Sequence, residues 1–143
     1  MHERAATVVE SGNGPYGRFI TAGGHVFGAD EPAELGGKNS GPDTYELLLS
    51  ALGACTAMTL RTFADRRKMR LDRVEVRLRH AQRANAQAGL TDRFERVIAL
   101  SGELSAEERQ KLLDIADICP VSQTLQRSSS VVSTLRVPAE TGS

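Results

Sequence analysis

Residues 41–67 read GPDTYELLLSALGACTAMTLRTFADRR, and this stretch decides the fold. Asp43 or Thr44 is suited to cap a helix N-terminus, because a short side-chain oxygen can accept a free backbone N–H. Apolar residues then recur at helical spacing, namely Leu47, Leu48, Ala51, Leu52, Cys55, Met58 and Phe63. The pattern predicts one helix from about Thr44 to Arg67. Its middle, residues 50–57, carries no charge, which is typical of a helix that is buried on several sides.

Short strands are expected before this helix. Residues 5–9 and 18–22 are rich in apolar and β-branched side chains, and a Gly12-Asn13-Gly14-Pro15 turn lies between them. A second turn at Gly23-Gly24 leads into residues 25–28. The spacing predicts a small antiparallel sheet, followed by a loop that contains the Gly36-Gly37 pair.

A hairpin and shorter helices are expected after it. Residues 71–83 alternate apolar and polar side chains, as a half-buried strand does, and residues 93–101 are its expected partner. Ser105 and Glu108 form a capping box for a helix that Cys119-Pro120 ends. Residues 121–126 predict one further helical turn, and residues 131–137 a last strand. This order of elements predicts an α+β fold in a single domain, residues 1–143.

Charge and composition exclude several classes of function. Eighteen Lys and Arg residues balance eighteen Asp and Glu residues, which argues against nucleic-acid binding through bulk phosphate attraction. No apolar run reaches the roughly 18 residues of a membrane span, and residues 1–10 lack the apolar stretch of a secretion signal. We therefore expect a cytoplasmic protein with no membrane and no nucleic-acid partner. Two cysteines with no histidine near either disfavour a zinc site, and no metal is expected.

The two cysteines are the candidate reactive groups. Cys55 lies in the apolar middle of the long helix, where a cysteine often serves as a small buried hydrophobe. Cys119 precedes Pro120, which predicts a position at or next to a helix N-terminus, where the pKa of a thiol is lowered. Cys119 is equally compatible with a helix end that has no role. A third interpretation couples the two as a reversible dithiol, the usual form of a cytosolic disulfide. Spacing alone leaves these interpretations open.

Both cysteines lie in motifs that resemble those of a known family. Residues 41–56, GPDTYELLLSALGACT, resemble the first cysteine motif of the OsmC/Ohr family, the osmotically induced and organic hydroperoxide resistance proteins. Cys119-Pro120-Val121-Ser122 resembles the second motif, and the separation between the two also fits. The resemblance extends over nearly the whole chain, up to Val137. Tyr16 to Pro32 and the Gly36-Gly37 loop resemble a subgroup of short OsmC-like proteins that also occur fused to an α/β-hydrolase domain.

The resemblance implies a fold and an activity. The implied fold is α+β, with antiparallel sheets that enclose two long central helices, and with two chains intertwined in a homodimer whose active sites lie at the interface. The implied activity is a thiol peroxidase for organic hydroperoxides. Cys55 would attack the peroxide and become a sulfenic acid, and Cys119 would resolve it as a disulfide. A dithiol reductant, a lipoylated protein in the best-known members, would restore both thiols without any cofactor. The apolar neighbours of Cys55 favour organic peroxides over hydrogen peroxide.

The resemblance also implies a pair of residues that activate the thiol. Burial raises the pKa of a thiol, and the family offsets this with an Arg from the glycine-rich N-terminal region, backed by a Glu on the helix. Arg18 is the candidate Arg here. The family's acid falls on Tyr45, which lies ~80° from Cys55 around the helix, whereas Glu46 lies ~180° away. Tyr45 and Glu46 are candidates to line a rearranged site; the alternative is that Glu46 is an ordinary acid of the first helical turn.

Two other functions are kept as alternatives. A non-enzymatic OsmC-like module would bind a small apolar ligand at the dimer interface, with thiols that are inert or redox-sensing, and Tyr45 in place of the acid favours it. A cysteine hydrolase would need a base near Cys55, and His25 or His80 would have to approach it in the fold. In all OsmC-like interpretations we expect residues 47–63 at the centre of the dimer, because this helix has too few polar positions for an exposed face.

Overall fold

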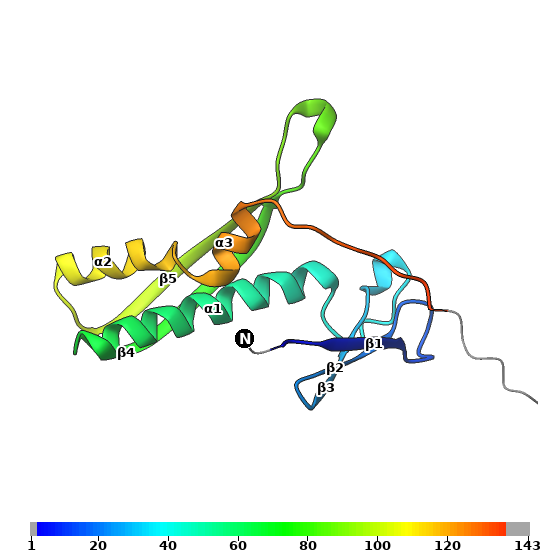
Figure 1. The fold of residues 1–143 in the computed structure, drawn as a ribbon, viewed down its shortest axis with the longest axis horizontal. Coiled ribbons are helices and arrows are strands. Elements are labelled where there is room, and N and C mark those ends of the chain that lie inside the picture. Colours follow the sequence, from blue (N-terminus) through cyan, green and yellow to red (C-terminus); the bar gives the residue numbers. More distant parts are fainter. Residues whose placement is uncertain (1–2, 137–143) are drawn as a thin grey trace, which may run out of the picture.

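One long helix organises the chain. In the computed structural model, which describes residues 3–136, α1 runs from Thr44 to Arg66 and confirms the predicted helix (Figure 1). Asp43 is its N-cap. The Asp43 carboxylate accepts the Glu46 backbone N–H at 2.7 Å, and the Glu46 carboxylate accepts the Asp43 N–H at 3.0 Å. This reciprocal capping box satisfies two backbone donors and fixes where the helix begins.

A three-stranded antiparallel sheet precedes α1. It consists of β1 (Ala6–Glu10), β2 (Arg18–Ala22) and β3 (His25–Ala29), in the order β1-β2-β3, and confirms the predicted small antiparallel sheet. Figure 1 shows it below the N-terminal half of α1, and the short 3₁₀ helix η1 (Ala33–Leu35) comes between β3 and α1 in the chain. The register places Val9 opposite Phe19 on one face, and both remain exposed. Within one chain this sheet therefore has an uncovered apolar face.

A buried carboxylate shapes the loop between this sheet and α1. Asp30 is buried, and one of its oxygens accepts the Ser40 hydroxyl at 2.6 Å, the Ser40 N–H at 3.1 Å and the Lys38 N–H at 3.2 Å. Its other oxygen accepts the Glu31 N–H at 2.7 Å. The Ser40 hydroxyl is the main reason that the pKa of Asp30 lies below its usual value. These bonds hold the loop and so help to place the start of α1.

A long hairpin and two short helices follow α1. The hairpin pairs β4 (Arg70–Gln82) with β5 (Arg93–Glu103), and the 3₁₀ helix η2 (Ala86–Ala88) lies at its tip. Helices α2 (Ala106–Ala116) and α3 (Pro120–Gln126) come next. Helix α1 packs against β4 and against both short helices (Figure 1). The predicted α+β class, with antiparallel sheets, is confirmed.

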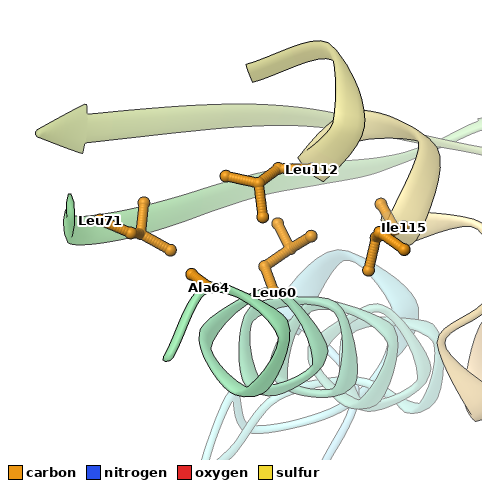
Figure 2. Close-up of a cluster of buried hydrophobic side chains, with 6 residues drawn as sticks. Leu60, Ala64, Leu71, Leu112 and Ile115 are labelled. Carbon is orange, nitrogen blue, oxygen red and sulfur yellow. The ribbon is translucent and has the colours of Figure 1, made fainter. Parts of the chain in front are cut away.

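The hydrophobic core lies at the C-terminal half of α1. Figure 2 shows Leu60 and Ala64 of α1 facing Leu71 of β4 and Leu112 and Ile115 of α2. Leu60 and Leu112 are fully buried. The apolar positions recur at helical spacing in α1 and α2, so their contacts follow directly from the sequence pattern. The core thus holds one end of α1 firmly, while Cys55 lies one to two turns further towards its N-terminus.

The predicted last strand is not present as far as the structure describes it. Residues 131–136 have no regular structure, and Val137 lies outside the described residues. Val131 and Val132 are 90% and 86% exposed, and Leu135 is 88% exposed. A strand needs the backbone donors and acceptors of a neighbour, and a single chain offers this segment none within residues 3–136.

Helix α1 also corrects the expectation that no segment is long and apolar enough to cross a membrane. By length and composition α1 passes that test, although only 28% of its most apolar window is buried within the chain. Small residues such as Ser50, Gly53 and Thr56 interrupt the apolar run in the sequence but hardly lower its mean hydropathy. The core helix of a soluble protein passes the same test of length and composition, so one such helix is weak support for a membrane span.

Candidate active site

Cys55 lies on the wall of an apolar cavity. The cavity has a volume of about 570 Å³ and lies between α1 and the segment that joins α2 to α3. Its wall includes Met58 and Phe63 of α1, and Ile115, Ile118 and Pro120 from the other side. Arg66 is the charged residue of the lining. Cys55 is half-buried, so a ligand in this cavity would meet its sulfur.

Cys119 lies behind Cys55 and is fully buried. It is the N-cap of α3, and its sulfur accepts the Ser122 backbone N–H at 3.4 Å. The Thr56 hydroxyl oxygen lies 3.9 Å from the same sulfur. The two thiols are hydrogen-bonding partners of one another, and neither is in a disulfide. The fold thus brings together two cysteines that are 64 positions apart in the sequence.

The surroundings shift the two pKa values in opposite directions. Burial raises the pKa of Cys55, and its hydrogen bond with Cys119 adds to this rise. Burial also opposes ionisation of Cys119, but the hydrogen bonds from Cys55, the Ser122 N–H and Thr56 together outweigh it, and the pKa of Cys119 is lowered. In such a coupled pair the thiol with the lower pKa ionises first, so a first negative charge would favour Cys119 over Cys55.

Arg96 of β5 reaches the same place and was not anticipated from the sequence. Its guanidinium donates to the Thr56 hydroxyl at 2.9 Å and to the Ser122 hydroxyl at 3.3 Å, and these two residues flank Cys119. It also pairs with Asp117 at 3.1 Å. The Arg96 side chain is only 14% exposed, whereas that of Asp117 is 78% exposed. A nearly buried cation therefore stands behind Cys119, with its counter-ion on the solvent side.

A signal for Arg96 does exist in the sequence. Phe94, Ile98 and Leu100 occupy every second position of β5 and point inward, and Arg96 shares their face. A charged residue at an inward position of a strand is rarely buried without a partner. Which residues it meets cannot be read from this pattern, because Thr56 and Ser122 come from elements that are far away in the chain.

The remaining sequence-predicted residues lie elsewhere in the single chain. The side-chain hydrogen bonds of Arg18, within residues 3–136, stay in its own turn and run to the carbonyls of Pro15 and Gly17, at 3.1 and 2.9 Å. Glu46 uses its carboxylate for the capping box of α1. Tyr45 stacks on His80, with ring centroids 4.8 Å apart.

The two histidines considered as bases have other surroundings. His80 Nε2 donates to the Asp92 carboxylate at 2.8 Å, and its ring is stacked between Tyr45 and Phe94. His25 lies in β3. Among the hydrogen bonds of the described residues, none joins either histidine to a cysteine. The geometry of one chain therefore does not favour a cysteine hydrolase.

Tyr45 and Arg96 border a second, more polar cavity of about 870 Å³. Phe94, Asp117 and Ser122 line it as well, together with apolar residues of α1 and α3. Cys55 and Cys119 are not among its lining residues. Tyr45 thus lines a cavity, but a different one from the cavity that Cys55 faces.

Comparisons with known proteins agree with the fold and with the cysteine motifs. The family model described as OsmC-like protein matches residues 37–134, well over half of the chain and the part that holds both cysteines. A comparison with curated protein sequences finds no match.

Solved structures resemble the whole chain at low identity. An OsmC-like protein from Mycoplasma pneumoniae is 19% identical with a TM-score of 0.74, over 87% of this chain and 88% of that one. An organic hydroperoxide resistance protein, OsmC, from Legionella pneumophila is 20% identical with a TM-score of 0.58, over 88% and 90%. An OsmC-like protein of unknown function from Vibrio cholerae is 12% identical with a TM-score of 0.71, over 88% and 95%. With the fold and both cysteine motifs in agreement, the chain belongs to the OsmC-like protein family, as the OsmC/Ohr resemblance of its motifs implied.

Proposed function

We propose that this protein is a cysteine-based thiol peroxidase that reduces organic hydroperoxides to alcohols. The observation that carries the proposal is a pair of free, hydrogen-bonded thiols of which one, Cys55, faces an apolar cavity of about 570 Å³. A cavity of this size and character suits a small organic ligand. Some structural relatives are described as organic hydroperoxide resistance proteins, which supports the same activity.

The two cysteines have different places and therefore different roles in the proposal. Cys55 meets the peroxide, because it lines the cavity, and its sulfur takes up one oxygen to become a sulfenic acid. Cys119 is buried directly behind it and attacks this sulfenic acid to form the disulfide. A dithiol reductant such as a lipoylated protein then restores both thiols by exchange in the cytoplasm.

The proposal includes a homodimer. Much of α1 is apolar and exposed within one chain, since only 28% of its most apolar window is buried, and Met58 is 68% exposed beside the cavity. A second copy would cover these surfaces and bring two α1 helices together. Arg18 bonds only within its own turn among the described contacts of one chain, so its proposed role at Cys55 depends on such a copy or on a rearranged turn.

Turnover with organic hydroperoxides tests this function. The purified protein should consume cumene hydroperoxide in the presence of a dithiol such as dihydrolipoamide, and should consume hydrogen peroxide more slowly. Cys55→Ser should abolish turnover. Cys119→Ser should allow one oxidation and then stall as a sulfenic acid, which a dimedone-type probe would trap. Normal turnover by Cys119→Ser with a dithiol would exclude the resolving role.

A binding module is the second candidate function. The apolar cavity and the raised pKa of Cys55 favour it, because a protonated thiol is a poor nucleophile. It predicts that the protein consumes no hydroperoxide with any dithiol, and that an apolar ligand raises the melting temperature equally in the parent protein and in Cys119→Ser. Catalytic turnover that depends on Cys55 would reject this alternative.

A further inference from the structure

We propose that Arg96 is a positioning residue that holds Cys119 as the thiolate, so that Cys119 first takes the proton of Cys55 and later resolves its sulfenic acid. The proposal rests on the proposed peroxidase function and adds a residue and a proton path to it. It assigns the activation of the reactive thiol to β5, α1 and α3 of a single chain.

The contacts of Arg96 fix the two hydroxyl groups that flank Cys119. Arginine carries only donors, so its guanidinium occupies an acceptor site on the oxygen of Thr56, at 2.9 Å, and of Ser122, at 3.3 Å. Each hydroxyl hydrogen must then point away from Arg96. The Thr56 hydroxyl hydrogen is then left with two acceptors, the Leu52 carbonyl at 2.7 Å and the Cys119 sulfur at 3.9 Å. Arg96 thus orders the groups around the sulfur without touching it.

The charges around Cys119 favour a negative sulfur. Arg96 faces it from β5 through Thr56 and Ser122, and its partner Asp117 lies on the exposed side of the guanidinium. Arg66 is the charged residue that lines the cavity on the α1 side. Cys55 is the titratable group in direct contact, and its thiol donates to Cys119. Because the Arg96 side chain is only 14% exposed, its field is screened less than that of a charge on the open surface.

The proton path explains how Cys55 reacts although its own pKa is raised. The Cys119 thiolate accepts the Cys55 proton as the Cys55 sulfur attacks the terminal oxygen of the hydroperoxide. A sulfur–oxygen bond forms, the oxygen–oxygen bond breaks, and the alkoxide leaves with the electron pair. The alkoxide takes the proton back from Cys119 and departs as the alcohol. Cys55 is oxidised by two electrons to a sulfenic acid, the peroxide is reduced, and Cys119 is again a thiolate.

The same thiolate then completes the oxidation. The Cys119 sulfur attacks the sulfur of the Cys55 sulfenic acid, a disulfide bond forms, and hydroxide leaves and is protonated by solvent to water. An ionised Cys119 is needed in both steps. In this chain Tyr45 stands where the family's acid falls and stacks on His80 instead, so the path through Cys119 supplies the activation that this acid does not.

Titration of the single thiol tests the central link. In the Cys55→Ser background, thiolate ultraviolet absorbance against pH reports the ionisation of Cys119 even though the sulfur is buried. The Cys55→Ser/Cys119→Ser protein gives the tyrosine background to subtract. Arg96→Met should move the Cys119 transition to higher pH, with roughly tenfold less thiolate at a fixed pH for each unit. Arg96→Lys, which keeps the charge, should recover part of this loss.

A second variant and a second measurement complete the test. If Arg96→Met does not fold, Thr56→Val removes one of the two linking hydroxyls while Arg96 stays, and it should move the transition in the same direction by less. In proteins with both cysteines, Arg96→Met should slow disulfide formation after one equivalent of cumene hydroperoxide. The matched control Arg73→Met, at an exposed position of β4, should not. An unchanged transition in a folded Arg96→Met protein overturns the proposal.

The result is distinguishable from a failure of the proposed function. If the parent protein forms no disulfide with any organic hydroperoxide, the peroxidase function and the proton path both fail. The titration then still decides whether Arg96 holds the thiolate. If the parent protein turns over normally and Arg96→Met matches it in both the titration and the rate of disulfide formation, the peroxidase stands and the role of Arg96 is rejected.

Discussion

Cys55 and Cys119 differ in what surrounds them, and their surroundings decide which role each thiol can take in the proposed reaction. Cys55 faces an apolar cavity and lacks a nearby cation among the hydrogen bonds of the described residues, so burial raises its pKa. Cys119 has no exposed surface, yet it receives hydrogen bonds from α1 and α3 and has Arg96 behind Thr56. One thiol therefore faces a cavity, and the other has surroundings that lower its pKa.

Glu46 illustrates how an acid next to a motif can have a purely local role. Glu46→Ala should lower the free energy of unfolding by roughly 0.5–1.5 kcal/mol, because one hydrogen bond of the capping box is lost. Turnover per folded molecule should not change, since the carboxylate bonds to the Asp43 N–H. Thermal unfolding and cumene hydroperoxide turnover measure the two effects. A large loss of turnover without a change in stability would place Glu46 in the thiol network.

At the scale of elements, the site depends on how firmly α1 is anchored. Its C-terminal half packs into the core with Leu71 of β4 and with α2, as Figure 2 shows. Gly53 allows a close approach to β4, because an added Cβ would lie 2.7 Å from Leu78 Cδ1. These contacts fix the position of Cys55 and Thr56 relative to α3.

The packing of α1 gives a stability prediction. Leu60→Ala should lower the free energy of unfolding by about 2–5 kcal/mol, because Leu60 is fully buried and the surrounding core cannot fill the space. Leu90→Ala, in the exposed hairpin loop, is the matched control and should change it by about 0.5 kcal/mol or less. Urea unfolding followed by circular dichroism measures both. Equal effects would mean that α1 is not anchored by this core.

The elements could largely be predicted from the sequence, whereas the site could be predicted only in part. Local signals sufficed for α1 with its N-cap at Asp43 or Thr44, for the hairpin and for the capping box at Ser105, because each is encoded within a few residues. The meeting of the cysteines was implied by family motifs and not by spacing. Arg96 could not be predicted as a site residue, because its partners Thr56, Asp117 and Ser122 lie far from it in the chain. The prediction of a strand at 131–137 was wrong for residues 131–136, because a strand also needs a neighbouring strand to pair with.

At the scale of the whole molecule, a single chain leaves too much apolar surface uncovered. The face of the N-terminal sheet that carries Val9, Phe19 and Val26 is exposed, as is much of α1. Val131, Val132 and Leu135 extend from the body with no partner strand within residues 3–136. Exposed apolar patches of this extent mark interaction surfaces, and a second copy of the chain is the partner that we propose.

Light scattering after size exclusion tests the dimer. The protein should have twice the 15.4 kDa mass of the chain. Phe19→Lys, which puts a charge at the centre of the exposed sheet face, should shift the protein towards the monomer, and Gln87→Lys at the tip of the hairpin should leave it dimeric. A uniform monomer for the parent protein would contradict the proposed assembly.

The most direct test of the account is the state of the two sulfurs after one equivalent of organic hydroperoxide. The reduced protein is mixed with cumene hydroperoxide, remaining thiols are blocked, and peptides are mapped by mass spectrometry without reduction. The account predicts one intrachain Cys55–Cys119 disulfide, a loss of two hydrogen atoms per chain, and one cumyl alcohol formed per disulfide. Two free thiols in an otherwise unchanged chain, with the hydroperoxide left intact, would contradict it.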